Sequence, residues 1–293
     1  DLGYKPSRAA LGLRLGSFKT VGLVIPDLHN PFYTAFADKL ERHLNAHGYD
    51  LILENARNDM EFQSHCLESI LDRQIDAVVY FVSDLQSHLE YLKQAKKSGK
   101  HVLAMAGLAP KDAPFPFDSI EIDFASGIIE AVEYLLDLKH QKFAFLCALA
   151  KGQAAGDRPE VFEKLLGERG IPKENCSFIP CLHNLENVRE VFGQFLINVG
   201  DDRPTALIAM NDLSAIGAIR AAEKHGLRVP EDLSVIGVDN IPLGEFLHRK
   251  LTTIEQPLDE MARSACSILL SRLEEGDSSP NRPSSKRFVS RLL

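Results

Sequence analysis

Residues 204–257 constrain the fold of this chain more than any other part of its sequence. Three short apolar runs occur in it, at residues 206–210, 233–238 and 251–254. Each run is too short for a helix and rich in Ile, Val or Leu, which predicts buried strands. Residues 213–225, between the first two runs, place apolar side chains on one helical face, and Gly226 follows as a typical helix-terminating residue. A strand, a helix and a second strand in this order form one unit of a parallel sheet.

Two of these predicted strands end in polar pairs. Asn211 and Asp212 follow the first strand, and Asp239 and Asn240 follow the second. In open α/β sheets, ligands bind outside the carboxyl ends of the strands. Buried amides and carboxylates at these ends therefore predict a polar small-molecule site.

The same residues carry a family resemblance. They read AxNDxxAxGxxxAxxxxGxxVPxDxSVxGxDN and then LTTIxQP. This pattern closely resembles the effector domain of the lactose-repressor/galactose-repressor (LacI/GalR) family of bacterial transcription regulators. The resemblance covers the whole chain. It implies an α/β fold with two doubly wound parallel-sheet lobes, of the type I periplasmic-binding-protein-like kind. A sugar-sized effector would lie in the cleft between the lobes.

Composition is that of an ordinary soluble globular protein, with 293 residues, 45% hydrophobic and 25% charged. No apolar run approaches the ~20 residues of a membrane helix. The five cysteines are scattered without a CxxC pair, which favours buried thiols in a reducing compartment over disulfides or a zinc site. No signal peptide is visible, but Asp1 is not a natural start, so we expect an upstream piece.

Charge is unevenly distributed along the chain. The formal net charge is −8, yet residues 1–20 carry +3, because four basic residues there face only Asp1, and the remainder therefore carries −11. An acidic body does not attract nucleic acid, whereas a basic N-terminal arm does so more readily.

Residues 1–17 differ in character from the rest of the chain and resemble the end of the family's DNA-binding headpiece and its hinge helix. The resemblance implies DNA contacts by Arg8, Ala10 and Leu13, with Leu13 as a wedge between base pairs of the minor groove. Gly12 weakens so short a helix, which could fold on DNA. The alternative is a frayed linker with no role in DNA binding.

Three residues of the first lobe are candidate effector contacts. Asn30 and Phe32 belong to a segment that resembles the family's NPFY segment, and Phe81 ends the third predicted strand. Each has a structural alternative. Asn30 fits the N-cap position ahead of Pro31, and both phenylalanines could simply pack in the core.

The resemblance implies further contacts in the second half of the chain, at Ser126, Arg158 and Leu185. Arg158 matches the family arginine that reaches the effector, and its planar fork can donate to two hydroxyls, a carboxylate or a phosphate. The alternative is a surface arginine at a helix start. The chain departs from the family pattern at Phe124, where relatives carry asparagine, and at residues 148–150, where they carry a glycine-rich turn.

Three more candidates complete the site. Asp239 matches the family's effector-binding aspartate, Asn211 supplies a donor of complementary type, and Gln256 lies near an expected crossover between lobes. We expect residues 1–17 to form the hinge segment. Residues 18–138 plus 258–281 would form the N-terminal lobe, and residues 139–257 plus 282–293 the C-terminal lobe.

Motifs of catalysis are absent from the sequence: there is no GxxxxGK[ST], HExxH or GxSxG. We therefore expect no enzyme activity, no cofactor and no metal. The sequence favours a cytoplasmic, homodimeric transcriptional regulator, expected to be a repressor, that binds operator DNA under control of a sugar-like effector and has no membrane partner. The alternative is a periplasmic sugar-binding protein of a transporter, because fold alone does not separate the two.

Overall fold

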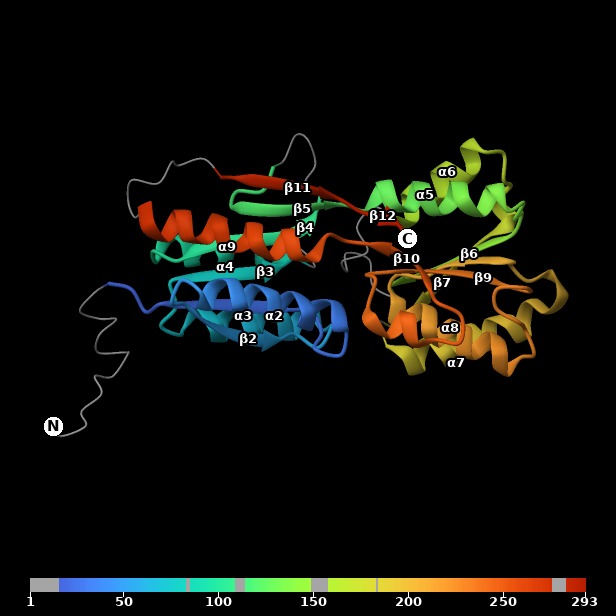
Figure 1. The fold of residues 1–293 in the computed structure, drawn as a ribbon, viewed down its shortest axis with the longest axis horizontal. Helices are drawn as coiled ribbons and strands as arrows, with labels where there is room; N and C mark the ends of the chain where they lie inside the picture. Colours follow the sequence, from blue (N-terminus) through green and yellow to red (C-terminus); the bar gives the residue numbers. More distant parts are fainter. Residues whose placement is uncertain (1–15, 83–84, 109–113, 149–157, 183, 276–282) are drawn as a thin grey trace. The chain divides into compact units, whose positions relative to one another are not determined.

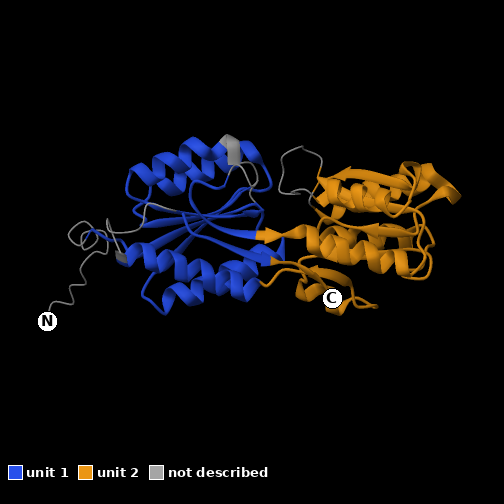
Figure 2. Ribbon diagram, turned by 90° about the horizontal axis from the view of Figure 1, so that it is seen from above, with its two compact units in different colours: residues 1–121, 258–288 blue, residues 122–257, 289–293 orange. Residues whose placement is uncertain are grey.

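Figure 1 shows the computed structural model, which describes residues 16–82, 85–108, 114–148, 158–182, 184–275 and 283–293. The chain divides into two compact units (Figure 2). Unit 1 comprises residues 1–121 and 258–288, and unit 2 comprises residues 122–257 and 289–293. Each unit contains one six-stranded sheet with helices. The prediction of two doubly wound α/β units is thereby confirmed.

The sheet of unit 1 has the strand order β11-β5-β4-β3-β1-β2. Strand β1 pairs in parallel with both β2 and β3, and β3 pairs in parallel with β4. The elements are β1 (Thr20–Ile25), α2 (Pro31–Asn45), β2 (Asp50–Asn55), α3 (Met60–Leu71), β3 (Ala77–Phe81), α4 (Leu85–Lys97), β4 (His101–Gly107), β5 (Asp118–Asp123), α9 (Leu258–Glu275) and β11 (Ser285–Val289).

Helices cover both faces of this sheet, as Figure 2 shows. Helix α2 packs against α9, and α3 packs against α4. One core cluster joins α3 and α4 to β1, β3 and β4, with Leu67, Val78 and Leu92 fully buried in it. Helix α2 buries an apolar stripe that includes Phe36 and Leu40. This alternation of strand and covering helix is what a parallel sheet requires.

The sheet of unit 2 has the strand order β12-β10-β9-β8-β6-β7. Only β12, among the pairings that the described residues show here, is antiparallel to its neighbour. The elements are α5 (Phe124–Asp137), β6 (Phe143–Ala148), α6 (Arg158–Glu168), η1 (Lys173–Asn175), β7 (Cys176–Cys181), α7 (Leu185–Val199), η2 (Gly200–Asp202), β8 (Ala206–Ile208), α8 (Asp212–Lys224), β9 (Ser234–Val238), η3 (Pro242–Phe246), β10 (Thr252–Glu255) and β12 (Arg291–Leu292).

Two core layers lie on opposite faces of the unit 2 sheet. Alternate residues of β6 show this: Phe143 and Phe145 pack with α5 and α6, whereas Ala144 and Leu146 pack with α7 and α8. Because both faces are covered, the strands are apolar on both sides, which explains the short continuous apolar runs in the sequence.

Most turns from a strand into a helix use one local device. An Asn or Asp after the strand accepts a hydrogen bond from a backbone N–H of the first helical turn, which stabilises the helix start. The residues that do so are Asn30, Asp59, Asp123, Asn184 and Asn211. These polar side chains at the carboxyl ends of strands therefore already cap helices, independently of any ligand.

The structure corrects two of the expected boundaries. Helix α5, which we placed in the N-terminal lobe, packs against α6, β10 and β12 of unit 2. The predicted single final strand at residues 288–293 is two strands: β11 lies at the edge of the first sheet and β12 at the edge of the second. Ser290 separates them and donates from its hydroxyl to the Asp123 carbonyl at 2.8 Å. Local propensity does not show which sheet a short strand joins, because the partner strand is distant in sequence.

Candidate functional site

Asp239 and Gln256 come together at the carboxyl edge of the unit 2 sheet. The Gln256 Nε2 donates to Asp239 Oδ1 at 2.8 Å, and the Asp239 N–H donates to the Ile254 carbonyl at 2.9 Å. Asp239 is half-buried and Gln256 buried. The backbone of Asp239 has a φ of 113° and that of Asn240 a φ of 54°. Two successive left-handed residues are costly, so other contacts must hold this turn.

Asp212 is the residue that holds the turn. Its carboxylate accepts from the Ile241 N–H at 2.8 Å and from the Thr253 hydroxyl at 2.6 Å. The Thr253 hydroxyl oxygen in turn accepts from the Asn240 N–H at 3.3 Å. Asp212 is 1% exposed, so it faces the protein interior. Its hydrogen bonds fix the turn that contains Asp239. The sequence pattern pairs Asp212 with Asn211 as polar groups for a ligand, and that interpretation missed its buried supporting role.

Asp212 also explains the glycine in β9. A Cβ at Gly237 would lie 2.1 Å from Asp212 Oδ1 and 3.2 Å from its Cα. A glycine inside a strand often marks such a close approach, which is the signal that the sequence offered. Burial raises the pKa of Asp212 to about 6, against the opposing effect of the hydrogen bonds from Thr253, Ile241 and Asn240.

Arg158 lies at the start of α6 and is 8% exposed. The alternative of a surface arginine is therefore wrong. Its Nη1 donates to the Met210 carbonyl at 3.1 Å, at the end of β8. Its Cζ lies 4.5 Å from the centre of the Phe124 ring, a cation–π distance. Phe124, which departs from the family pattern, thus covers one face of the guanidinium.

The other unit 2 candidates begin helices. Asn211 is buried, and its Oδ1 accepts from the Ser214 N–H at 2.8 Å as the N-cap of α8. The Ser126 hydroxyl donates to Asp123 Oδ2 at 2.9 Å, within the cap of α5. Leu185 is the first residue of α7 and is half-buried. These three residues have structural roles or positions, and their contacts with an effector stay predictions.

In unit 1, Asn30 is buried and caps α2, accepting from the Phe32 N–H at 3.0 Å. Phe81 meets Tyr33 and Phe36 edge to face, with centroids 5.1 Å apart in both pairs. Phe32 and Phe81 are 5% and 9% exposed. This aromatic group fills the core beneath the carboxyl end of the sheet, which favours the packing alternative for both phenylalanines.

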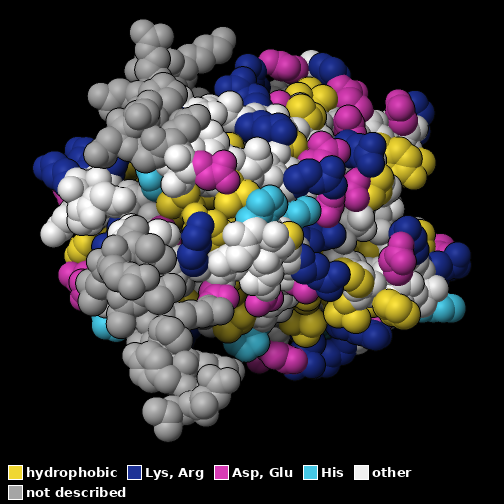
Figure 3. Space-filling view, turned by 60° about the vertical axis from the view of Figure 1, so that its left-hand side comes forward, with side chains coloured by type: hydrophobic (Ala, Val, Ile, Leu, Met, Phe, Trp, Pro, Cys, Tyr) yellow, Lys and Arg dark blue, Asp and Glu magenta, His cyan; other side chains and the backbone are white. Residues whose placement is uncertain are grey.

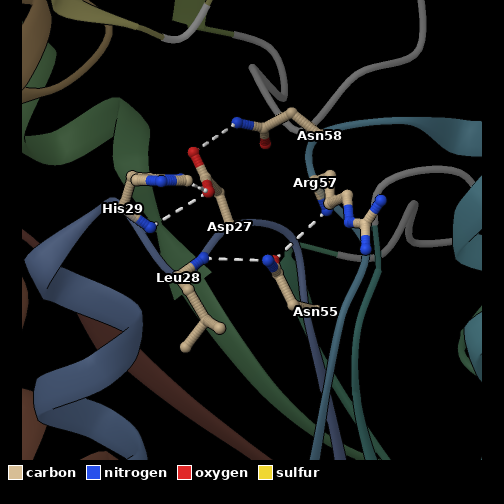
Figure 4. A network of polar contacts seen from close by, with 6 residues as sticks. All are labelled: Asp27, Leu28, His29, Asn55, Arg57 and Asn58. Atoms are coloured by element: carbon tan, nitrogen blue, oxygen red, sulfur yellow. Dashed lines mark hydrogen bonds and ion pairs between the residues drawn. The ribbon is translucent and has the colours of Figure 1, made fainter.

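A polar network joins the ends of β1 and β2 (Figure 4). Asp27 Oδ2 accepts from Asn58 Nδ2 at 3.0 Å, and its Oδ1 lies 2.9 Å from His29 Nδ1. The Asn55 Oδ1 accepts from the N–H of Leu28 and of Arg57, at 3.1 and 3.2 Å. The His29 side chain is 89% exposed. The network fixes the two loops and presents one exposed imidazole that no sequence motif had singled out.

Other features of the described residues include a groove and free cysteines. A groove of about 470 Å³ lies between α2 and α9, lined by His43, Arg263 and Glu274 among others. Within the described ranges, no group of His, Cys, Asp or Glu could hold a metal ion. All five cysteines are free, and burial raises the pKa of Cys181 to about 12. None of the described helices has the length and hydropathy that a membrane span requires.

The hinge candidates Arg8, Ala10 and Leu13 lie outside the described residues.

Comparisons with known proteins agree with this architecture. Residues 132–291 match the model of the periplasmic binding protein-like domain family. The HTH-type transcriptional repressor PurR of Photobacterium profundum is 30% identical over 275 residues, which cover 94% of this chain and 80% of the relative. A LacI family transcriptional regulator from Enterococcus faecium, solved with bound ribose, is 26% identical with a TM-score of 0.80, covering 94% of this chain and 96% of that chain.

A further solved relative is a LacI family transcriptional regulator from Arthrobacter sp. FB24 in complex with lactose. It is 29% identical, has a TM-score of 0.75, and the match covers 94% of this chain and 97% of that chain. Sequence and structure thus agree over nearly the whole chain. This chain belongs to the LacI/GalR family of transcriptional regulators and has that family's periplasmic-binding-protein-like fold.

Proposed function

We propose that this protein is a transcriptional repressor whose DNA binding is controlled by a small-molecule effector, a sugar or sugar derivative. The effector would bind at the carboxyl ends of the strands. Asp239, Gln256 and Arg158 would make its main polar contacts in unit 2. Asn30, Phe32, Phe81, Ser126, Leu185 and Asn211 remain the other proposed contacts.

The pairing of Asp239 with Gln256 is the observation that carries this proposal. Asp239 has a costly backbone conformation, in a turn that the buried Asp212 carboxylate fixes through Ile241, and Asp239 is only half-buried while Gln256 donates to it. Strained residues supported in this way cluster at ligand sites. A carboxylate accepts from hydroxyls, whereas the guanidinium of Arg158 donates to them. Acceptors and donors within one unit suit a polyhydroxylated ligand.

The relatives favour a regulator over the periplasmic alternative. The relative from Photobacterium profundum is a transcriptional repressor, and the two solved relatives are named transcriptional regulators, one with ribose and one with lactose. Figure 3 shows Lys and Arg side chains interspersed with Asp and Glu on the face it presents. We propose that DNA contact is made by residues 1–17, through Arg8, Ala10 and Leu13, and by any further DNA-binding segment.

We further propose that the protein acts in the cytoplasm as a homodimer, because two-fold protein symmetry matches a palindromic operator. Enzyme activity is no part of this proposal.

A thermal-shift screen of sugars, sugar phosphates and nucleobases tests the effector. A compound at ~100 times its Kd should stabilise the parent by roughly 2.7 kcal/mol. Asp239→Ala should abolish that shift. Asp38→Ala, which removes an exposed carboxylate of α2 that pairs with Arg42, should keep it. The proposed effector class is wrong if no sugar or sugar phosphate shifts the parent, or if only a nucleobase does. The proposed site is wrong if Asp239→Ala responds as the parent does.

A further inference from the structure

The chain enters the β1 strand through a short segment that Asp76 fastens. Asp76 precedes β3 and is 9% exposed. Its Oδ1 accepts from the Phe18 N–H at 2.8 Å, and its Oδ2 accepts from the Thr20 N–H at 3.0 Å. Its own N–H donates to the Thr20 carbonyl at 2.9 Å. One residue therefore makes three hydrogen bonds to a segment distant in sequence, two of them charge-assisted and so stronger than ordinary ones.

Lys19, between those two donors, is held as well. Its φ is 52°, an uncommon left-handed conformation for a non-glycine residue. Its carbonyl accepts from the Asp50 N–H at 2.8 Å. Its Nζ donates to the Tyr49 hydroxyl at 3.1 Å and lies 4.3 Å from the centre of that ring. Such a conformation persists when the surrounding contacts determine it, and here they come from Asp76, Tyr49 and Asp50.

This anchor stands at the amino end of β1, whereas the Asp27 network stands at its carboxyl end. Its hydrogen bond to Phe18 lies only three positions after residues 1–15, which carry the proposed DNA contacts. We propose that Asp76 is a positioning residue for DNA binding. By holding residues 18–20, it fixes where the N-terminal arm, residues 1–15, joins unit 1. A DNA-binding arm is thereby presented to DNA in one orientation. The consequence for DNA rests on the proposed function, but the anchor itself does not.

Limited trypsin digestion tests the anchor without any ligand. Trypsin cleaves after Lys19 only when the segment opens locally, so the cleavage rate reports the open population. In Asp76→Asn an amide nitrogen replaces one acceptor and faces a backbone N–H. We expect cleavage after Lys19 to accelerate at least tenfold, with little change in the urea midpoint of the whole protein. The matched control is Asp59→Asn, another carboxylate of unit 1 that accepts a backbone N–H, from Phe62 at 2.9 Å. It should leave this cleavage rate unchanged.

Operator binding by the full-length gene product tests the consequence. The probe is a duplex selected from random sequence by the parent protein, and the comparison is an unselected duplex of equal length. Asp76→Asn should weaken binding of the selected duplex about tenfold and leave the unselected one unchanged, because a purely structural defect would lower both. Phe18→Pro removes one donor while Asp76 stays in place. It should weaken binding of the selected duplex to the same extent, and it replaces Asp76→Asn in both assays if that variant does not fold.

A rate of cleavage after Lys19 equal to that of the parent in both Asp76→Asn and Phe18→Pro would overturn the anchor. Faster cleavage with parental binding of the selected duplex would overturn the positioning role. A parent that selects no duplex would overturn the proposed function, and the digestion alone would then decide the anchor.

Discussion

Gly237→Ala is the sharpest test of how unit 2 holds its candidate site. The added Cβ would lie 2.1 Å from Asp212 Oδ1. The carboxylate has no free rotation to offer, because Thr253 and Ile241 donate to it at 2.6 and 2.8 Å. If the Asp212 carboxylate moves to make room, the buried donors Thr253 and Ile241 lose their acceptor. If the carboxylate stays, the added methyl group pushes strand β9 away. Overpacking and a lost hydrogen bond together cost about 3 kcal/mol of unfolding free energy.

A double-mutant cycle isolates this contact. In an Asp212→Ala background the clashing oxygen is gone, so adding Gly237→Ala should cost about 1 kcal/mol, a coupling of about 2 kcal/mol. Urea unfolding of the parent, both single variants and the double variant measures it. Gly167→Ala in α6, where an added Cβ meets nothing within 4 Å, is the control and should be neutral or stabilising. Additive costs, or a Gly237→Ala protein as stable as the control, would refute the reasoning.

Further variants test the rest of the site and the arm. Asp239→Ala should abolish effector binding in isothermal titration with little loss of stability, whereas unchanged affinity would remove Asp239 from the site. The pKa of Asp212 is raised on folding to about 6. The contribution of protonated Asp212 to the free energy of unfolding is therefore fully present below pH ~4 and is lost as the pH rises through ~6. Between pH ~3 and pH ~7 the parent should lose roughly 3 kcal/mol of unfolding free energy relative to Asp212→Ala in urea titrations, and a constant difference would contradict the raised pKa. We propose that Gln256 transmits effector binding to the chain connection, because it donates to Asp239 and precedes Pro257, the last residue before the chain returns to unit 1. Gln256→Ala should therefore reduce ligand-driven compaction in small-angle scattering more than it reduces binding, and equal compaction would contradict this role. In a full-length protein, Leu13→Ala should weaken specific operator binding in filter assays and spare effector affinity, and parental operator affinity would make the hinge a linker.

Much of the fold is readable in the sequence because it depends on neighbours along the chain. A strand buried on both faces needs a continuous apolar run, and β9 has one over Ser234–Val238. A side-chain acceptor stabilises a helix start, and Asn30 provides one for α2 as the pattern ahead of Pro31 predicted. The position of Asp239 after β9 also made it a candidate contact, because ligands of such sheets bind at the carboxyl ends of strands. These features require no knowledge of distant contacts.

Tertiary structure alone decided what each polar residue faces. Asn211 and Asp212 are adjacent in sequence, yet Asp212 lies beneath the turn of Asp239 because Thr253, 41 positions away, donates to it. Arg158 is buried against Phe124 and Met210, contacts that no local pattern encodes. The last residues split between two sheets for the same reason. Propensity and periodicity act over one or two turns of chain, whereas these assignments depend on pairings between residues brought together only by folding.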